Sequence, residues 1–261
     1  MPLYISSENL TKEKTAMIDV KGRWVLITGA SRGIGKLIAQ KMADSGSNLI
    51  LQARKPEHLA SISEYASSKG SKVVTIGCDL ANPDEVKAMC ESISDYDIDI
   101  IFNNAGIQVT YRPDVFSTVP EDYDLSFRVN TTAPMIICYA FLPKMLKKGF
   151  GRIINTTSGI DNEPEQGPYS ASKAALDKVT KDLCKLINDE DIFICLTDPG
   201  WCRTDLGGPN APNAPESATK GMTAPAFASR GKNGKVYHAQ DYADMEFDDI
   251  VKGIEDGRFP L

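Results

Sequence analysis

The sequence predicts a single-domain α/β protein, a doubly wound parallel sheet of about seven strands with helices on both faces. Short apolar runs rich in β-branched residues alternate six times with segments whose apolar residues recur at helical spacing. Each apolar run ends in glycine or polar residues, which suits the carboxyl edge of a parallel sheet, where ligands bind. Together these observations favour parallel strands joined by right-handed helical crossovers.

The composition is that of a soluble globular protein. The 261 residues are enough to bury a full core, and 42% of them are hydrophobic and 25% charged. The net charge of −6 has both signs interspersed, so we expect neither nucleic acid nor an anionic membrane as a partner. The six cysteines are widely spread without a C-x-x-C pair, so we expect no metal site. The polar N-terminus and the lack of a long apolar run predict a cytoplasmic protein with reduced thiols.

The chain is expected to divide into three parts. Residues 1–16 are polar, lack core periodicity and form an N-terminal arm. The α/β domain covers residues 17–240, and residues 241–261 form an acidic C-terminal tail.

The first predicted element is a strand, a glycine turn and a helix over residues 24–42. The strand is the apolar run at residues 25–27, and the helix repeats Ile34, Ile38 and Met42 on one face. Residues 28–35 between them contain the spacing G-x-x-x-G-x-G. Glycines allow a sharp bend and close approach of the backbone to a ligand, and the free N–H groups of the first helical turn attract phosphate. The turn therefore predicts a pyrophosphate site.

The later strands and helices follow in alternation. The expected strands lie at residues 48–53, 72–77, 98–102, 152–157 and 192–197. The expected helices lie at residues 56–68, from residue 83 onward, at 123–147 and at 169–187. Residues 201–261 are rich in Pro, Gly and Ala and contain one strand candidate, at residues 235–238.

A tyrosine and a lysine four residues apart form the candidate catalytic pair. Tyr169 and Lys173 share one face of the last long helix, and a nearby ammonium favours the phenolate, which lowers the pKa of the phenol toward working pH. Such a phenol can act as a general acid and base. Tyr65 and Lys69 have the same spacing, but only Tyr169 follows a strand that ends in a hydroxyl, Ser158, at the ligand edge. Position therefore favours Tyr169 and makes the Tyr65 pair a solvated surface pair.

Taken together, the motifs resemble the short-chain dehydrogenase/reductase family over residues 18–240, which implies a Rossmann-type fold. The matching features, in order, are T-G-x-x-x-G-x-G at 28–35, Asp79, N-N-A-G at 103–106, Asn130, Ser158, Tyr169-x-x-x-Lys173, and Pro199-Gly200 with Thr204. The resemblance implies that Tyr169 is the proton donor and that Lys173 lowers its pKa and bonds the nicotinamide ribose. It further implies that Ser158 holds the substrate oxygen and that Asn130 anchors a water-linked proton relay.

The resemblance also implies a set of binding residues. Asp79 resembles the residue that binds the adenine, residues 103–106 the element beside the adenosine ribose, and Thr204 the contact to the carboxamide. The expected cofactor-binding residues are Gly29, Ser31, Arg32, Gly33, Ile34, Gly35, Arg54, Asp79, Leu80, Asn104, Ala105, Gly106, Tyr169, Lys173, Pro199, Gly200 and Thr204. The expected substrate-binding residues are Ser158, Ile160, Tyr169 and Trp201.

The end of the second strand predicts NADP(H) as the cofactor. In this fold an acidic residue there bonds the ribose 2′-hydroxyl and selects NAD, but this chain has Ala53, followed by Arg54 and Lys55. Arg32 in the glycine turn is expected to point toward the same ribose, so two guanidinium groups would bind the 2′-phosphate.

The sequence leaves the substrate open. The segment from Ser158 to Tyr169 is shorter than in many family members and carries Asp161, Glu163 and Glu165, while the segment after the sixth strand resembles that of carbonyl reductases. We expect hydride transfer between NADP(H) and a carbonyl or secondary alcohol. The alternatives are a 3-oxoacyl thioester reductase, a sugar or polyol dehydrogenase, and, from another class, a dinucleotide-binding regulator without turnover. Wide apolar stripes on the two long helices predict a homo-oligomer, a dimer or tetramer.

Overall fold

A computed structural model describes residues 17–188 and 191–259, so the predicted arm at residues 1–16 lies outside the described chain. It contains one parallel sheet of seven strands in the order β3-β2-β1-β4-β5-β6-β7, which confirms the doubly wound α/β prediction. The strands are β1 Trp24–Ile27, β2 Asn48–Ala53, β3 Val73–Gly77, β4 Ile98–Asn103, β5 Phe150–Thr156, β6 Asp191–Asp198 and β7 Val236–His238. The chain runs outward from β1 in one direction and then outward from β4 in the other. The crevice where ligands bind is expected where this direction switches.

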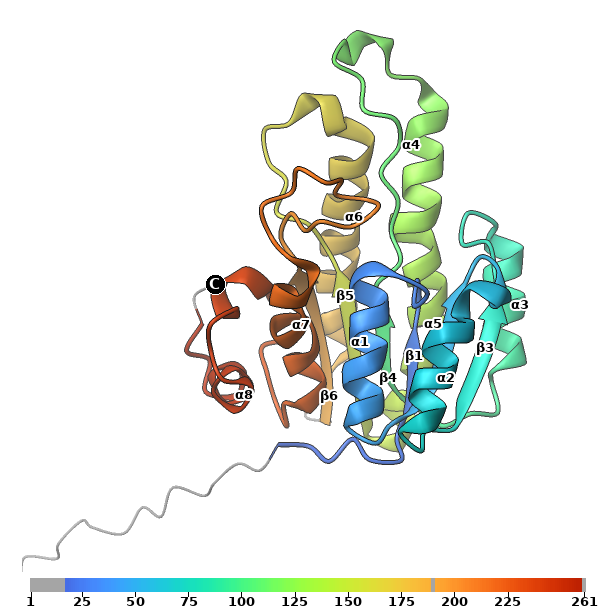
Figure 1. Cartoon of the computed structure of the whole chain (residues 1–261), viewed down its shortest axis with the longest axis vertical. Coiled ribbons are helices and arrows are strands. Elements are labelled where there is room, and N and C mark those ends of the chain that lie inside the picture. The colour runs from blue at the N-terminus through green and yellow to red at the C-terminus, as the bar shows by residue number, and fades with distance from the viewer. Residues whose placement is uncertain (1–16, 189–190, 260–261) are drawn as a thin grey trace, which may run out of the picture.

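Helices cover both faces of the sheet (Figure 1). The α-helices are α1 Gly33–Asp44, α2 Ala60–Ser68, α3 Pro83–Ser92, α4 Pro120–Phe127, α5 Ala133–Lys148, α6 Gly167–Leu183, α7 Pro215–Thr223 and α8 Phe247–Glu255. Short 3₁₀ turns lie at Pro56–Leu59, Val115–Ser117, Pro164–Gln166, Cys184–Leu186, Ala224–Phe227 and Ala239–Tyr242. One core cluster joins α1, α2, α7 and α8 to the sheet, and a second joins α3, α5 and α6 to its other face. Strands buried on both faces explain the continuous apolar runs in the sequence.

The expected long helix at residues 123–147 is interrupted. It consists of α4 and α5, joined by a π turn at Arg128–Thr132. Pro134 supplies a reason, because it has no N–H to bond the carbonyl of Asn130 and its ring crowds that carbonyl. The local turn widens there, as π turns at functional sites often do.

The predicted acidic tail is not an appendage. From residue 241 to residue 259 the chain includes α8, whose residues Phe247, Ile250, Val251 and Ile254 lie at helical spacing. Ile250, Val251 and Ile254 are almost fully buried in the core beside α1 and α7, and Phe247 packs against it. The domain boundary at residue 240 is therefore wrong, because the acidic residues occupy only the outer face of an amphipathic helix. Helix α7 was also not predicted.

Two helices and one loop extend beyond the carboxyl edge of the sheet. Figure 1 shows α4 and the N-terminal part of α6 projecting beyond it. Residues 201–213, which we call the strap, run between β6 and α7 and are closed by a bridge between Cys202 and Asn213. Within the described ranges, no helix is long and apolar enough to cross a bilayer.

Candidate active site

The glycine turn is fitted tightly to the end of β4. The Thr28 hydroxyl accepts hydrogen bonds from the N–H groups of Asn104, at 3.0 Å, and Ala105, at 3.1 Å. A Cβ atom on Gly35 would lie 2.2 Å from the Gly29 carbonyl oxygen and 2.5 Å from the Asn104 amide nitrogen. Gly29 itself has φ +66°, and a Cβ atom added to it would lie only 3.0 Å from the Cα of Ala105. The predicted glycines are thus required by the close approach of the turn to β4.

The start of α1 suits an anionic group. Among the described residues, no side chain caps α1 with a hydrogen bond, and Lys36 is the residue whose N–H bonds back to the Arg32 carbonyl. The N–H groups of the first turn therefore remain available, at the positive end of the helix dipole. Gly33 lies against the strap, where its Cβ would be 3.3 Å from the Thr204 methyl group. This turn fits the pyrophosphate predicted from the sequence.

The ends of β2 and β3 are joined to the turn by Gln52, which sequence reasoning missed. The buried Gln52 side chain accepts the Gly29 N–H at 3.0 Å and donates to the Cys78 carbonyl at 2.8 Å. Asp79 follows in an exposed position, where its carboxylate accepts the N–H of Ala81, and Leu80 is buried. A polar residue inside an apolar strand was the available signal for Gln52.

The arginines expected at the 2′-phosphate do not converge in this structure. Arg54 and Lys55 are exposed directly after β2, as predicted. The Arg32 guanidinium instead pairs with Asp205 of the strap, with 2.6 Å between nitrogen and oxygen and both side chains about two-thirds exposed. Arg32 therefore connects the glycine turn to the strap, and Arg54 is the guanidinium placed beside the end of β2.

The candidate catalytic residues come together at the ends of β5 and α6. Tyr169 lies in the first turn of α6, is 8% exposed and forms a side-chain hydrogen bond with Ser158. Lys173, one turn later, is 4% exposed and donates from Nζ to the Thr156 carbonyl at 2.7 Å. Its ammonium lies 5.9 Å from the centre of the Tyr169 ring. Lys173 is thus buried beneath the phenol that Ser158 contacts.

Asn130 joins the chain segment after β4 to α6. Its side chain accepts the N–H of Ile107 and donates to the Ile107 carbonyl, both at 2.9 Å, and donates to the Ser172 hydroxyl at 3.0 Å. A Cβ on Gly106 would lie 3.4 Å from both the Asn130 Oδ1 and the Lys173 Nζ. The π turn thus directs the fully buried Asn130 amide toward the catalytic helix.

The ionisation of the pair differs from the sequence expectation. The pKa of Tyr169 is raised to about 12, chiefly by burial of the phenol. The hydrogen bond from Ser158 lowers this pKa, and the negative charge of Asp198 raises it. Burial lowers the pKa of Lys173 to about 8, while the carboxylates of Asp177 and Asp198 raise it. Loss of solvation is therefore the main influence on the phenol, and the lowering of its pKa that was expected from Lys173 is not found in this structure. At neutral pH the phenol keeps its proton.

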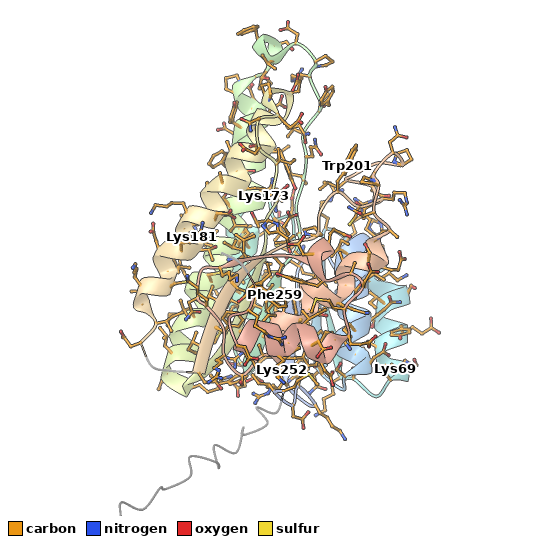
Figure 2. The ribbon with its side chains drawn as sticks, turned by 90° about the vertical axis from the view of Figure 1, so that its left-hand side faces the viewer. Lys69, Lys173, Lys181, Trp201, Lys252 and Phe259 are labelled. Carbon is orange, nitrogen blue, oxygen red and sulfur yellow. The ribbon has the colours of Figure 1, made fainter. Side chains whose placement is uncertain are left out.

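The second Tyr-Lys pair occupies a different environment. The Tyr65 hydroxyl donates to Asp44 at 2.8 Å, and Lys69 pairs with the same carboxylate at 3.1 Å. Lys69 is exposed and lies near the base of the molecule in Figure 2, whereas Lys173 is buried. The sequence interpretation of the Tyr65 pair as a surface cluster agrees with this placement.

Asp198, the last residue of β6, is a site neighbour that the sequence did not single out. Its carboxylate accepts the N–H of Gly200 at 2.8 Å and the N–H of Gly159 at 3.0 Å. The Nδ1 atom of His238, the last residue of β7, lies 3.1 Å from the same carboxylate. The only signal in the sequence was an acidic residue directly before Pro199.

The predicted substrate residues lie on two loops. Ile160 follows Ser158 and Gly159 and is half-buried. Trp201 at the start of the strap is 58% exposed, and its indole N–H donates to the Gly207 carbonyl at 2.7 Å. Figure 2 shows Trp201 on the loop that faces the tall helices. The Thr204 hydroxyl accepts the Gly207 N–H at 3.1 Å, so Thr204 closes a turn of the strap beside Gly33.

Comparison with known proteins identifies relatives that match most of the chain. The family model described as short chain dehydrogenase matches residues 23–214. The 3-oxoacyl-[acyl-carrier-protein] reductase FabG of Aquifex aeolicus is 32% identical over 195 residues, which cover 72% of this chain and 77% of that protein. The NADPH-dependent aldehyde reductase-like protein, chloroplastic, of Arabidopsis thaliana is 30% identical over 204 residues, covering 72% and 76%.

Solved structures share the fold. A short-chain type dehydrogenase/reductase from Mycobacterium marinum superposes with a TM-score of 0.76 at 28% identity, over 87% of this chain and 98% of that one. A metagenomic short-chain oxidoreductase in complex with NADP gives a TM-score of 0.65 at 28% identity, over 70% of this chain and 84% of that one.

Proposed function

Since the chain belongs to the short-chain dehydrogenase family, we propose that it transfers a hydride between NADP(H) and a carbonyl or secondary alcohol, with Tyr169 as general acid and base. The observation that carries this proposal is the buried Tyr169 phenol bonded to Ser158 directly above the buried Lys173 ammonium. Two adjacent titratable side chains that are buried at the ligand-binding edge of the sheet are typical of a catalytic site.

The chain's own residues account for the movement of the proton. In the reducing direction, the Ser158 hydroxyl and the Tyr169 phenol bond the carbonyl oxygen, where negative charge develops. With its pKa held near 12 by burial, the phenol is protonated at neutral pH and donates its proton to that oxygen. Lys173, charged below a pKa of about 8, stabilises the phenolate that remains. Asn130 bonds both the chain segment after β4 and α6, and it therefore holds this segment in a fixed position beside Tyr169 and Lys173.

The cofactor would be held by the residues around the glycine turn. The open N–H groups of residues 33–35 suit its pyrophosphate, and the segment at residues 104–106 suits the adjacent ribose. When bound, the nicotinamide supplies or accepts the hydride. The adenine pocket would include Asp79 and Leu80, and the carboxamide would meet Thr204.

Substitution of Tyr169 by Phe tests the catalytic assignment. It removes the proton donor and keeps the ring, so kcat is expected to fall by about two to four orders of magnitude with cofactor binding retained. The measurement is steady-state turnover of a reactive ketone together with a cofactor titration by fluorescence. Tyr65→Phe is the matched control and should leave kcat unchanged, because Tyr65 contacts Asp44 at the surface. A Tyr169→Phe enzyme with more than about a tenth of wild-type turnover would contradict the assignment.

The preference for NADP(H) is supported by charge at the end of β2. Arg54 and Lys55 are exposed there, where a carboxylate would repel a 2′-phosphate. The NADP complex of the metagenomic oxidoreductase and the NADPH named for the Arabidopsis relative are consistent with this choice. Arg32 would contribute only after leaving Asp205, so Arg54 is the principal contact in this proposal.

Substitution of Arg54 by Ala tests that preference. A charge-assisted bond to phosphate contributes about 1.5–3 kcal/mol, so KM for NADPH should rise roughly ten- to a hundredfold. KM for NADH should stay almost unchanged, because NADH has no 2′-phosphate. Arg258→Ala, which removes an exposed arginine paired with Asp256, is the control. Equal kcat/KM for NADH and NADPH in the wild type would refute the preference.

The substrate class is best described as a small carbonyl compound or its alcohol. The FabG relative favours a 3-oxoacyl thioester as a second candidate, at 32% identity. The loop before Tyr169 carries exposed carboxylates at Asp161 and Glu163, which disfavour anionic substrates near Ile160. A panel of ketones, diketones, sugars, polyols and acyl thioesters, followed by absorbance of the reduced nicotinamide, separates these classes. Turnover with none of them would favour a dinucleotide-binding regulator.

We further propose that the enzyme is a homo-oligomer, a dimer or tetramer, and works in the cytoplasm. Large apolar side chains remain exposed on two helices that follow each other in the chain, including Leu125 on α4 and Tyr139 on α5. Exposed apolar area on adjoining helices commonly marks a subunit interface.

A further inference from the structure

The Asp198 carboxylate connects the ends of three adjacent strands beside the candidate catalytic residues. It accepts N–H groups from Gly159, which follows β5, and from Gly200, which follows β6, and it contacts His238 at the end of β7. Its side chain is only 11% exposed, whereas that of His238 is 52% exposed. The donors that surround this carboxylate replace the water that it has lost on burial.

The contact with Gly159 holds the backbone next to Ser158. Gly159 is the residue after Ser158, so the peptide whose N–H bonds Asp198 also fixes the backbone of Ser158. A Cβ on Gly159 would lie 2.9 Å from the Asp198 Oδ2 and 3.8 Å from the His238 ring. A side chain at Gly159 would therefore push the Asp198 carboxylate out of its present position.

The charge of Asp198 also reaches the proton-transfer pair. It raises the pKa of both Tyr169 and Lys173, so it favours the protonated form of each. The other titratable groups that interact with it are Asp177 of α6 and Cys202 of the strap, besides His238. Negative charge at this position therefore acts on the same proton that the proposed reaction moves.

We propose that Asp198, held by His238, is a positioning residue of the active site that directs Ser158 and maintains a negative charge beside Tyr169 and Lys173. For the role of Tyr169, this inference rests on the proposed function. It adds the last residues of β6 and β7 to a catalytic group whose Ser158, Tyr169 and Lys173 come from the end of β5 and from α6. His238 orients the carboxylate, since its Nδ1 contacts the Oδ2 atom that Gly159 also bonds.

The test compares Asp198→Asn with His238→Asn and the wild type in alcohol oxidation as a function of pH. Asp198→Asn keeps the shape but loses the charge and places an amide among N–H donors, so kcat should fall about tenfold or more. The rise of kcat with pH should also move to lower pH, because the charge that raises the pKa of Tyr169 is gone. His238→Asn keeps the carboxylate, so kcat should fall less and the pH midpoint should stay in place.

A turnover-independent measurement accompanies the kinetics. Phenolate absorbance, taken as the difference between each enzyme and its Tyr169→Phe form, should appear at lower pH in Asp198→Asn. This measurement separates the two proposals, because it reports the effect of Asp198 on Tyr169 even if no tested alcohol is a substrate. A purely structural Asp198 would lower kcat equally at every pH and leave both midpoints unmoved, and that result would overturn the inference.

Gly159→Ala provides a second variant if Asp198→Asn does not fold. The added methyl group would displace the carboxylate or the Ser158 peptide without changing any charge, so kcat should fall while the thermal transition is kept. Wild-type kcat in folded Gly159→Ala, or in folded Asp198→Asn, would contradict the inference.

Discussion

At the scale of single residues, the site contains a lysine whose charged form is disfavoured by burial in the folded protein. Lys173 is buried in the interior, and its pKa falls from 10.5 to about 8 because burial disfavours the ammonium. Between those pH values the unfolded chain binds a proton at this side chain that the folded chain does not. Stability therefore rises with pH across this window, and below pH 8 the full cost remains, roughly 3 kcal/mol for a shift of this size.

Replacement of Lys173 by Met should therefore stabilise the protein while abolishing turnover. The apolar side chain removes the burial cost, partly offset by about 1 kcal/mol because the Thr156 carbonyl loses its donor. Urea unfolding at pH 7 and at pH 10 is the measurement, and the advantage of the variant should be larger at pH 7. Lys178→Met, at an exposed ion pair with Asp182, is the control and should change stability by no more than about 0.5 kcal/mol. A Lys173→Met protein less stable than wild type at pH 7 would contradict the argument.

The structure brings together the candidate catalytic residues that the sequence singled out. Tyr169, Lys173 and Ser158 could be singled out from local spacing, because each is tied to a strand end or a helical repeat, whereas Asn130 was expected only from the family resemblance. Asp198 and Gln52 were missed, because their importance lies in partners 23 to 40 residues away. The pairing of Arg32 with Asp205 was missed for the same reason, since Asp205 belongs to the strap.

At the scale of elements, the strands were predicted closely and the C-terminal helices were not. Strands such as β2 begin and end at the predicted residues because apolar runs and turn residues are local signals. The π turn between α4 and α5 depends on the tertiary bonds of Asn130 as well as on Pro134, and local spacing did not reveal it. Helix α8 had a clear apolar repeat, but its acidic residues led to the interpretation of a tail.

Substitution of Ile250 by Ala tests whether α8 is part of the core. Ile250 is fully buried, so its truncation should lower the free energy of unfolding by about 2–5 kcal/mol. Denaturant unfolding followed by circular dichroism measures it. Asp248→Ala, on the exposed face of the same helix, should have little effect. If the two substitutions changed stability equally, α8 would not pack as described.

At the scale of the whole molecule, the exposed apolar side chains predict assembly. Tyr139 is 61% exposed on α5 and Leu125 is 42% exposed on α4, although α5 also packs against the sheet. Light scattering at micromolar concentration should give the mass of a dimer or tetramer. Tyr139→Glu should lower that mass, because a buried unpaired charge disfavours an apolar interface. Lys252→Glu on α8 is the control, and a monomer mass for the wild type would exclude the assembly.

The π turn at Arg128–Thr132 also determines how α4 is rotated about the helix axis relative to α5. Each residue of an α-helix advances the side-chain direction by about 100°, so removal of one residue here would restore a regular helix and rotate everything before it. Asn130 would turn away from Ser172, and α4, which projects above the sheet in Figure 1, would swing to another side of α6. The length of this five-residue segment therefore cannot change without loss of the site.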